Sequence, residues 1–169
     1  MIDYRDATIA DGPALDAMAR AIWLETFGHS AKPADIDLYL ATAYGPTGKL
    51  LRDLADPAIA FHLACEGDRI VGYTKVGAPF LADAEPGAVQ LSQLYVVSDR
   101  HGSGIAGVLM DWSVTWARSK GAPALLLTVW EENPRAIAFY KRRGFEQVGE
   151  YAFPVGEQID RDLVLRLAL

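Results

Sequence analysis

The sequence predicts one α/β domain with a mixed central sheet, and three observations support this prediction. Strand-like and helix-like patterns alternate along most of the chain. A β-branched and aromatic run at 94–97 is followed by glycines and then by an amphipathic helical pattern that reaches Trp116. The nearly uninterrupted apolar run at 124–130 is typical of a strand that is buried on both faces.

The first half of the chain is predicted to contain a strand, two helices and three further strands. Residues 2–8 alternate well enough for a first strand. A helical pattern covers 12–28, and a second one begins at Pro33. Glycines and a proline at 45–48 interrupt the second helix, and 49–54 predicts a further helical turn or two. The period then changes, and strands are expected at 58–65, 69–76 and 89–97.

The second half is predicted to contain two helices and three strands. One helix follows Gly104 and ends near Gly121, a residue type common just after a helix. Asn133 as N-cap and Pro134 at the first helical position begin another helix, which ends at Gly144. Strands are expected at 124–130, 145–151 and 163–167. The prediction is therefore a mixed sheet of about seven strands with about four helices.

Composition indicates one globular domain spanning residues 1–169. The chain is 51% hydrophobic and 10% aromatic, which is too apolar for a disordered protein and sufficient for a sizeable core. Its 22 acidic and 16 basic residues give a formal charge of −6. This balance argues against nucleic acid as the main partner and is compatible with a cationic small-molecule substrate.

Targeting signals and cysteine chemistry are both sparse. No apolar run approaches the roughly 18 residues that a membrane-spanning helix needs, and the first residues lack the order of a signal peptide. We therefore expect a cytoplasmic protein with no membrane association. Cys65 is the only cysteine, so the sequence excludes an intrachain disulfide and a cysteine-based zinc site, and we expect no metal. Its apolar neighbours predict a buried thiol.

The glycines at 102, 104 and 107 predict an anion-binding turn. A strand, a glycine turn and a helix N-terminus in this order let backbone amides approach a ligand closely, and the helix dipole favours negative charge there. The spacing also fits a dinucleotide fingerprint, with Glu131 roughly 20 residues further on. A glycine turn that merely caps the helix is a third interpretation. No Lys-Ser/Thr pair follows the glycines, which excludes a Walker loop.

Two stretches together match one superfamily. The first runs from Leu94-Tyr-Val-Val to His101-Gly-Ser-Gly-Ile-Ala, and the second from Val129-Trp-Glu-Glu-Asn133-Pro-Arg-Ala through Phe139-Tyr140 to Gly144-Phe145. The pair resembles the GNAT N-acetyltransferases, which transfer an acetyl group from acetyl-CoA to an amine. With the element order included, the resemblance covers nearly the whole chain and implies a GNAT-like acyl-CoA N-acyltransferase fold. It disfavours the dinucleotide interpretation, because a Rossmann glycine follows its strand almost directly and usually opens the domain.

The resemblance implies that acetyl-CoA is the co-substrate and that the glycine turn binds its pyrophosphate. The family usually begins this loop with Gln or Arg, whereas this chain has His101 preceded by Arg100. We expect one of these two side chains to contact phosphate, although a solvated loop arginine is the alternative for Arg100. The residues expected at the cofactor are Leu94, Tyr95, Val96, Val97, Arg100, His101, Gly102, Ser103, Gly104, Ile105, Ala106 and Asn133.

Tyr140 is the predicted proton donor for the departing thiolate. It lies seven residues after Asn133, close to two helical turns, so both project from one helix face. A phenol of pKa about 10 can protonate a thiolate whose conjugate acid has a pKa of about 8.5. The alternative is a core tyrosine that packs beside Phe139. Backbone amides around residues 95–97 are expected to polarise the acetyl carbonyl, and the amine is expected to attack directly in a ternary complex.

The general base stays open. Related enzymes often carry a glutamate on one of the two central strands, but the comparable places here hold Gln90 and Thr128. The nearest plausible carboxylates are Glu25, Glu131 and Glu132, and a water chain or no protein base is equally compatible. A non-catalytic acyl-CoA-binding or sensing module is therefore the alternative function, against which the intact Tyr140 argues.

The acceptor is expected to be a small cationic amine. Glu25-Thr-Phe27-Gly followed by Asp35-x-x-x-Tyr39 resembles the first two helices of the bacterial spermidine/polyamine branch. The resemblance implies that Glu25, Phe27 and Tyr39 wall the acceptor site, and Trp130 is a further candidate. Two ordinary amphipathic helices are the alternative. Other small amines, an antibiotic or a protein N-terminus stay open as acceptors, and a homodimer through the strand-rich C-terminus is compatible with the pattern.

Overall fold

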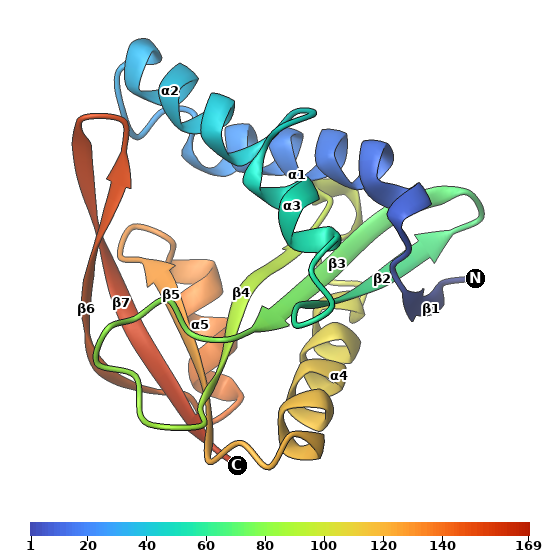
Figure 1. Ribbon diagram of the computed structural model, residues 1–169, viewed down its shortest axis with the longest axis vertical. Coiled ribbons are helices and arrows are strands. Elements are labelled where there is room, and N and C mark those ends of the chain that lie inside the picture. Colours follow the sequence, from blue (N-terminus) through green and yellow to red (C-terminus); the bar gives the residue numbers. More distant parts are fainter.

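A computed structural model, which describes residues 1–169, contains one mixed sheet of seven strands in the order β1-β2-β3-β4-β5-β7-β6 (Figure 1). Only β4 and β5 pair in parallel; the other neighbours are antiparallel. The strands are β1 (Asp3–Asp6), β2 (Ala60–Glu66), β3 (Arg69–Gly77), β4 (Val89–Val96), β5 (Ala124–Trp130), β6 (Glu146–Val155) and β7 (Gln158–Ala168). The predicted α/β class with a mixed sheet is confirmed.

Five α-helices flank the sheet, one more than predicted. They are α1 (Gly12–Phe27), α2 (Pro33–Ala43), α3 (Lys49–Leu54), α4 (Ile105–Ser119) and α5 (Pro134–Arg142). The expected extra helical turn at 49–54 is a separate helix because Gly45, at φ +87°, turns the chain away from α2 and buried Leu50 anchors α3. None of the helices combines the length and the apolar character needed to cross a membrane.

The helices cover the two faces of the sheet separately (Figure 1). Helices α1, α2 and α3 pack on the face that presents Phe61, Leu63 and Tyr73. Helices α4 and α5 cover the opposite face, where Leu125 and Leu127 of β5 meet Met110 of α4. The buried set includes Cys65, which confirms the prediction of a core thiol.

The C-terminal hairpin is longer than the predicted strands at 145–151 and 163–167. Strands β6 and β7 pair from Glu146–Arg166 to Val155–Gln158, around the two-residue turn Gly156-Glu157. Pro154 and the charged residues near this turn hide the strand pattern in the sequence. Proline is nevertheless tolerated there because β6 is the edge strand of the sheet.

The hairpin tip is fixed on the N-terminus of α2, which predicts a strong effect of Gly156→Ala. Gly156 has φ +61°, and an added Cβ would lie 2.5 Å from the Cα atom of Asp35. The left-handed backbone and the steric clash together should lower the free energy of unfolding by about 3 kcal/mol in urea denaturation. Gly67→Ala is the matched control, because Gly67 has φ +59° and nothing within 4 Å of an added Cβ. It should lose only about 1 kcal/mol; equal losses would contradict the docking of this tip.

Candidate active site

A cleft of about 1050 Å³ opens where β4 and β5 separate. These strands pair only at Val89–Leu125 and Gln90–Leu126, after which they diverge. The cleft is lined by β4, the turn that follows it, β5, α1, α5 and the β6–β7 hairpin. Its position in the middle of the sheet makes it accessible to groups from both helical layers.

Backbone amides of β4 face the gap between the separating strands. The Val97 amide donates to the Val71 carbonyl of β3 at 3.0 Å. Because successive peptide groups of a strand point to opposite sides, the amides of Leu94 and Val96 point away from β3 and toward β5. The Val96 carbonyl, which contacts His101 Nε2 at 2.9 Å, points the same way. An extended ligand can therefore pair with this edge, and a carbonyl placed there can be polarised.

The turn after β4 presents four amides with no acceptor in the protein: those of Gly102, Gly104, Ile105 and Ala106. Neighbouring His101 and Ser103 instead donate their amides to backbone carbonyls within the turn. Positive φ angles of 78° at Gly102 and 88° at Gly104 allow this backbone path. Because the free amides open helix α4, the turn fits the diphosphate of coenzyme A.

Basic side chains surround this end of the cleft. Arg100 is held by Glu66 at 2.5 Å and by Asp99 at 3.2 Å. The His101 ring lies between the Val96 carbonyl and the Arg135 guanidinium, and because Arg135 can only donate, Nδ1 accepts and Nε2 carries the hydrogen. Arg142 also lines the cleft and takes part in no ion pair. Arg135 and Arg142 are candidate phosphate contacts that the sequence did not single out.

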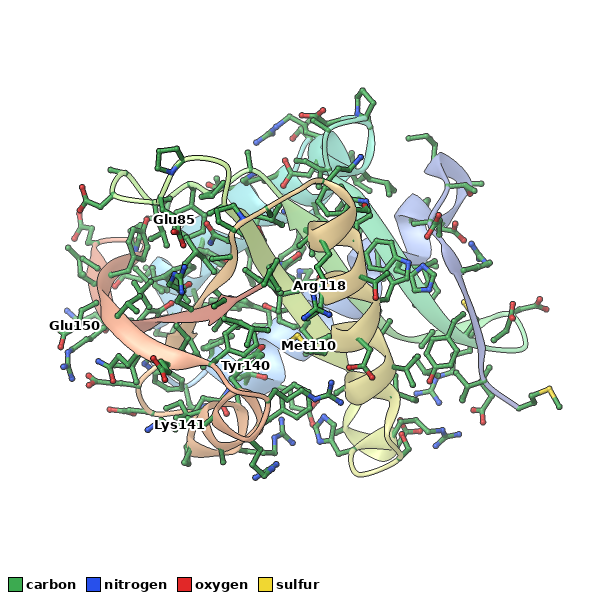
Figure 2. All side chains as sticks on the ribbon, turned by 90° about the horizontal axis from the view of Figure 1, so that it is seen from below. Glu85, Met110, Arg118, Tyr140, Lys141 and Glu150 are labelled. Atoms are coloured by element: carbon green, nitrogen blue, oxygen red, sulfur yellow. The ribbon has the colours of Figure 1, made fainter.

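Tyr140 lies between α5 and the sheet and lines the cleft. It points inward, whereas the next residue, Lys141, lies on the outer side of the helix (Figure 2). Its ring packs edge-on against Phe139 at 5.4 Å and Phe145 at 5.7 Å. Burial raises the pKa of the Tyr140 phenol well above its usual value, so the hydroxyl keeps its proton across the physiological range. The two interpretations of Tyr140, packing beside Phe139 and facing the cofactor cleft, are therefore compatible.

Asn133 begins the helix that carries Tyr140. Its Oδ1 accepts from the Ala136 amide at 3.2 Å, and Pro134 occupies the first helical position, as the sequence predicts. Asn133 also lines the cleft. The cap fixes the start of α5 and thereby the direction of Tyr140 two turns later.

The opposite end of the cleft is aromatic and acidic. The ring centroids of Trp130 of β5 and Phe27 of α1 are 5.4 Å apart, and those of Tyr39 and Phe153 of β6 are 5.8 Å apart. The carboxylates at this end come from Glu25, Asp160 and Asp162. None of the residues that α1, α2, β4, β5, β6 and β7 contribute to the lining is basic.

The cleft brings together all predicted site residues except Val97 and Ser103. The Val97 amide is used in the β3–β4 ladder, and the Ser103 hydroxyl donates to the Arg100 carbonyl at 2.6 Å. The predicted residues that line it are Leu94, Tyr95, Val96, Arg100, His101, Gly102, Gly104, Ile105, Ala106, Asn133, Tyr140, Glu25, Phe27, Tyr39 and Trp130.

Of the carboxylates considered as bases, only one lines the cleft. Glu25 lines the cleft and is exposed, whereas Glu131 is paired with Arg161 and Glu132 lies outside the lining. Gln90 is buried, with its side chain accepting from the Phe80 amide at 3.0 Å. Asp160 and Asp162 lie outside the strand predicted at 163–167, so sequence reasoning missed them. No group of three His, Cys, Asp or Glu side chains is arranged to hold a metal ion.

Comparisons with known proteins agree with this geometry. Residues 15–145 match the acetyltransferase (GNAT) family. The chain is 26% identical over 161 residues to an uncharacterized N-acetyltransferase of Lactobacillus delbrueckii subsp. lactis, covering 94% of this chain and 92% of the relative. It is 31% identical over 148 residues to an uncharacterized N-acetyltransferase of Mycobacterium tuberculosis, covering 86% of this chain and 92% of the relative.

A solved structure shares the whole architecture. The crystal structure of the PaiA N-acetyltransferase from Thermoplasma acidophilum, in complex with coenzyme A, superposes with a TM-score of 0.78. The similarity covers 100% of this chain and 99% of that one. At 19% sequence identity, it shows that the two proteins share a fold.

Proposed function

Because this chain belongs to the acetyltransferase (GNAT) family and is an acetyl-CoA-dependent N-acetyltransferase, we propose that its acceptor is a small cationic primary amine such as a polyamine. The charge polarity of the cleft is the observation that carries this proposal. Free amides and arginines surround one end, while carboxylates without any basic neighbour in the lining surround the other. The anionic coenzyme matches the first end, and a cationic acceptor matches the second.

The aromatic wall favours the same class of acceptor. Ammonium groups are attracted to the faces of Trp and Tyr rings, and the attraction grows when the site excludes water. Trp130, Tyr39 and Phe27 line the acidic end, where methylene groups of a polyamine could pack between its charges. The formal charge of −6 adds a weaker, long-range attraction for cations.

The residues divide the reaction between them. The amides of Leu94 and Val96 face the place where the thioester carbonyl would lie and can stabilise its developing negative charge. Tyr140, which lines the cleft on the α5 side, gives its proton to the departing sulfur. Acetyl-CoA supplies the activated acetyl group, and the amine attacks it directly while both substrates are bound.

A panel of amines tests the proposal. Purified protein is incubated with acetyl-CoA and with spermidine, putrescine, phenethylamine or a peptide with a free N-terminal alanine, and thiol release is followed. We expect spermidine and putrescine to exceed the acceptor-free background. γ-Aminobutyrate is the matched control, because it has a carboxylate in place of one terminal aminomethyl group of putrescine, and it should be a much poorer acceptor.

Two results would contradict the proposal in different ways. No thiol release above background with any polyamine would end the assignment of the acceptor class. Binding of coenzyme A without turnover across the whole panel would favour the non-catalytic acyl-CoA-binding module.

A further inference from the structure

Asp162 of β7 is a buried carboxylic acid in the cleft with no ion-pair partner. It is only 7% exposed, and none of the salt bridges of the protein involves it. Buried carboxylates are normally paired with a cation or held by several hydrogen bonds, because an isolated buried charge is costly. The nearby Asp160, by comparison, accepts a hydrogen bond from Gln158 at 2.6 Å. An unpaired buried acid that lines the cleft of an enzyme is a candidate for proton transfer.

Strand register places Asp162 on the acceptor side of the sheet. Asp162 is directly opposite Trp130 in the β5–β7 ladder, and directly opposite partners in a ladder share a face of the sheet. Thr128, two residues before Trp130, lies on this face as well. Residues of the alternate set, such as Val129 and Leu163, instead pack with Tyr140 on the α5 face. The proton donor and Asp162 therefore lie on opposite faces and line one cleft through the gap beside β5.

We propose that Asp162 is the general base that removes the proton from the acceptor nitrogen during acetyl transfer. This role rests on the proposed function, because it requires an amine acceptor that enters from the face covered by α1 and α2. Asp162 would supply the base that the central strands lack, because Gln90 and Thr128 stand where related enzymes often carry a glutamate.

The surroundings of Asp162 suit this role. Burial is the main cause that raises its pKa to about 6, the charge of Asp160 adds to the rise, and the Thr128 side chain partly opposes it. Such an acid is mostly ionised at neutral pH yet binds a proton well. The other ionisable groups that face it or its aromatic neighbours are Glu25 of α1, His29 after α1, Tyr39 of α2 and Tyr151 of β6. The adjacent Arg161 is bound to Glu131 and Glu150.

The step balances with the groups present. The lone pair of the neutral amine forms a bond to the acetyl carbon, and the Asp162 carboxylate takes one proton from the nitrogen. The carbon–sulfur bond then breaks with its electron pair on sulfur, which takes the Tyr140 proton. Asp162 releases its proton to solvent and Tyr140 regains one, so the products are the amide and the free thiol.

Asp162→Asn tests the proposal in the enzyme as it exists. With acetyl-CoA and the best amine of the panel at pH 8, we expect kcat to fall about 10²–10⁴-fold. In wild type, kcat should decline as the pH falls below about 6, where Asp162 becomes protonated, and this decline should be absent from the residual activity of the variant. The rise in melting temperature on adding coenzyme A should be unchanged.

Two neighbouring variants separate the role of Asp162 from that of other ionisable side chains nearby. The ring centroids of His29 and Trp130 are 6.0 Å apart, so His29 is the alternative cause of the decline in kcat at low pH. If Asp162 causes this decline, the His29→Asn variant must still show it. Asp160→Asn should raise KM for a cationic amine. It should also move the decline in kcat to lower pH, because it removes a charge that raises the Asp162 pKa. If the decline in kcat at low pH disappears in His29→Asn, the assignment of Asp162 as the general base is overturned.

Thermal unfolding gives a test that needs no substrate. A carboxyl whose pKa is raised on folding destabilises the fold when it is ionised, so protonation stabilises the native state. Asp162→Asn should therefore melt several degrees above wild type at pH 8, and the difference should shrink between pH 6 and about 4. Equal melting at every pH would overturn the view of Asp162 as an unpaired buried acid.

The outcomes distinguish the two proposals. If Asp162→Asn leaves both kcat and its decline at low pH unchanged, the role of Asp162 is overturned, whereas the proposed amine acetyltransferase function stands. A wild-type protein that acetylates nothing in the panel would contradict the proposed function and, with it, this role.

Discussion

Tyr140→Phe should turn over about 10²–10⁴-fold more slowly than wild type. The substitution removes only the hydroxyl and keeps the ring that packs against Phe139 and Phe145. Without the phenol, the leaving sulfur must depart as a free thiolate or take a proton from water. Burial raises the pKa of the phenol, but the same apolar surroundings also raise the proton affinity of the departing thiolate, so transfer between them stays feasible.

Coenzyme A binding should stay intact in this variant. Ligand at 100 times its Kd stabilises a protein by about 2.7 kcal/mol, and the resulting rise in melting temperature should be equal in wild type and Tyr140→Phe. Tyr4→Phe, on β1 at the far edge of the sheet, is the matched control and should retain full turnover. An unchanged rate in Tyr140→Phe would remove the hydroxyl from the mechanism, and a lost thermal shift would assign it to cofactor binding instead.

Much of the fold could be predicted because its signals are local. The apolar run at 124–130 coincides with β5, and Asn133-Pro134 opens α5 through a cap that involves neighbouring residues only. The glycine turn is equally local, since its two left-handed glycines and the start of α4 follow one another directly. Residues whose position depends on such short segments were found from the sequence, and most of them line the cleft.

The acidic end of the cleft depends on a longer-range feature. Asp162 reaches the site because β7 runs antiparallel beside β5 in a register that sets it opposite Trp130. Sequence patterns do not reveal such a register, and residues 157–162 lay outside the strand predicted at 163–167. The spacing of Asp160 and Asp162 by two residues was the available signal, because alternate residues of a strand share a face.

The basic end shows the same limit. The glycine turn itself was predicted, but Arg135 reaches it from α5, across one helix and one strand of intervening chain. Its contact with His101 links the two motifs in space and could not be inferred from either alone. Local motifs therefore located most residues of the candidate cofactor site, whereas the side chains around it required the tertiary structure.

Asp53→Ala should cause the largest loss of stability, about 3–5 kcal/mol. Asp53 of α3 accepts hydrogen bonds from Lys75 of β3 and, at 2.7 Å, from Lys49. Lys75 is 7% exposed, so without Asp53 its ammonium would remain buried and uncompensated. A domain of this size is stable by about 5–15 kcal/mol, so urea denaturation should show a large shift of the midpoint.

The pH dependence of this loss has a definite sign. Burial lowers the pKa of Lys75, and an unpaired ammonium loses its proton more readily still. The loss caused by Asp53→Ala should therefore be largest near neutral pH and smaller as the pH rises, because the neutral amine is less costly to bury. Lys49→Met is the matched control: its side chain is 61% exposed, and it should lose no more than about 1 kcal/mol.

Removing the buried cation as well should restore most of the stability. Lys75→Met exchanges the ammonium for an apolar group of similar length, and buried ion pairs replaced by apolar residues are often neutral or more stable. The double variant Asp53→Ala/Lys75→Met should thus unfold at a higher urea concentration than Asp53→Ala alone. Additive losses in this cycle would mean that the cost arises from the packing of α3, and the buried charge of Lys75 would then not explain it.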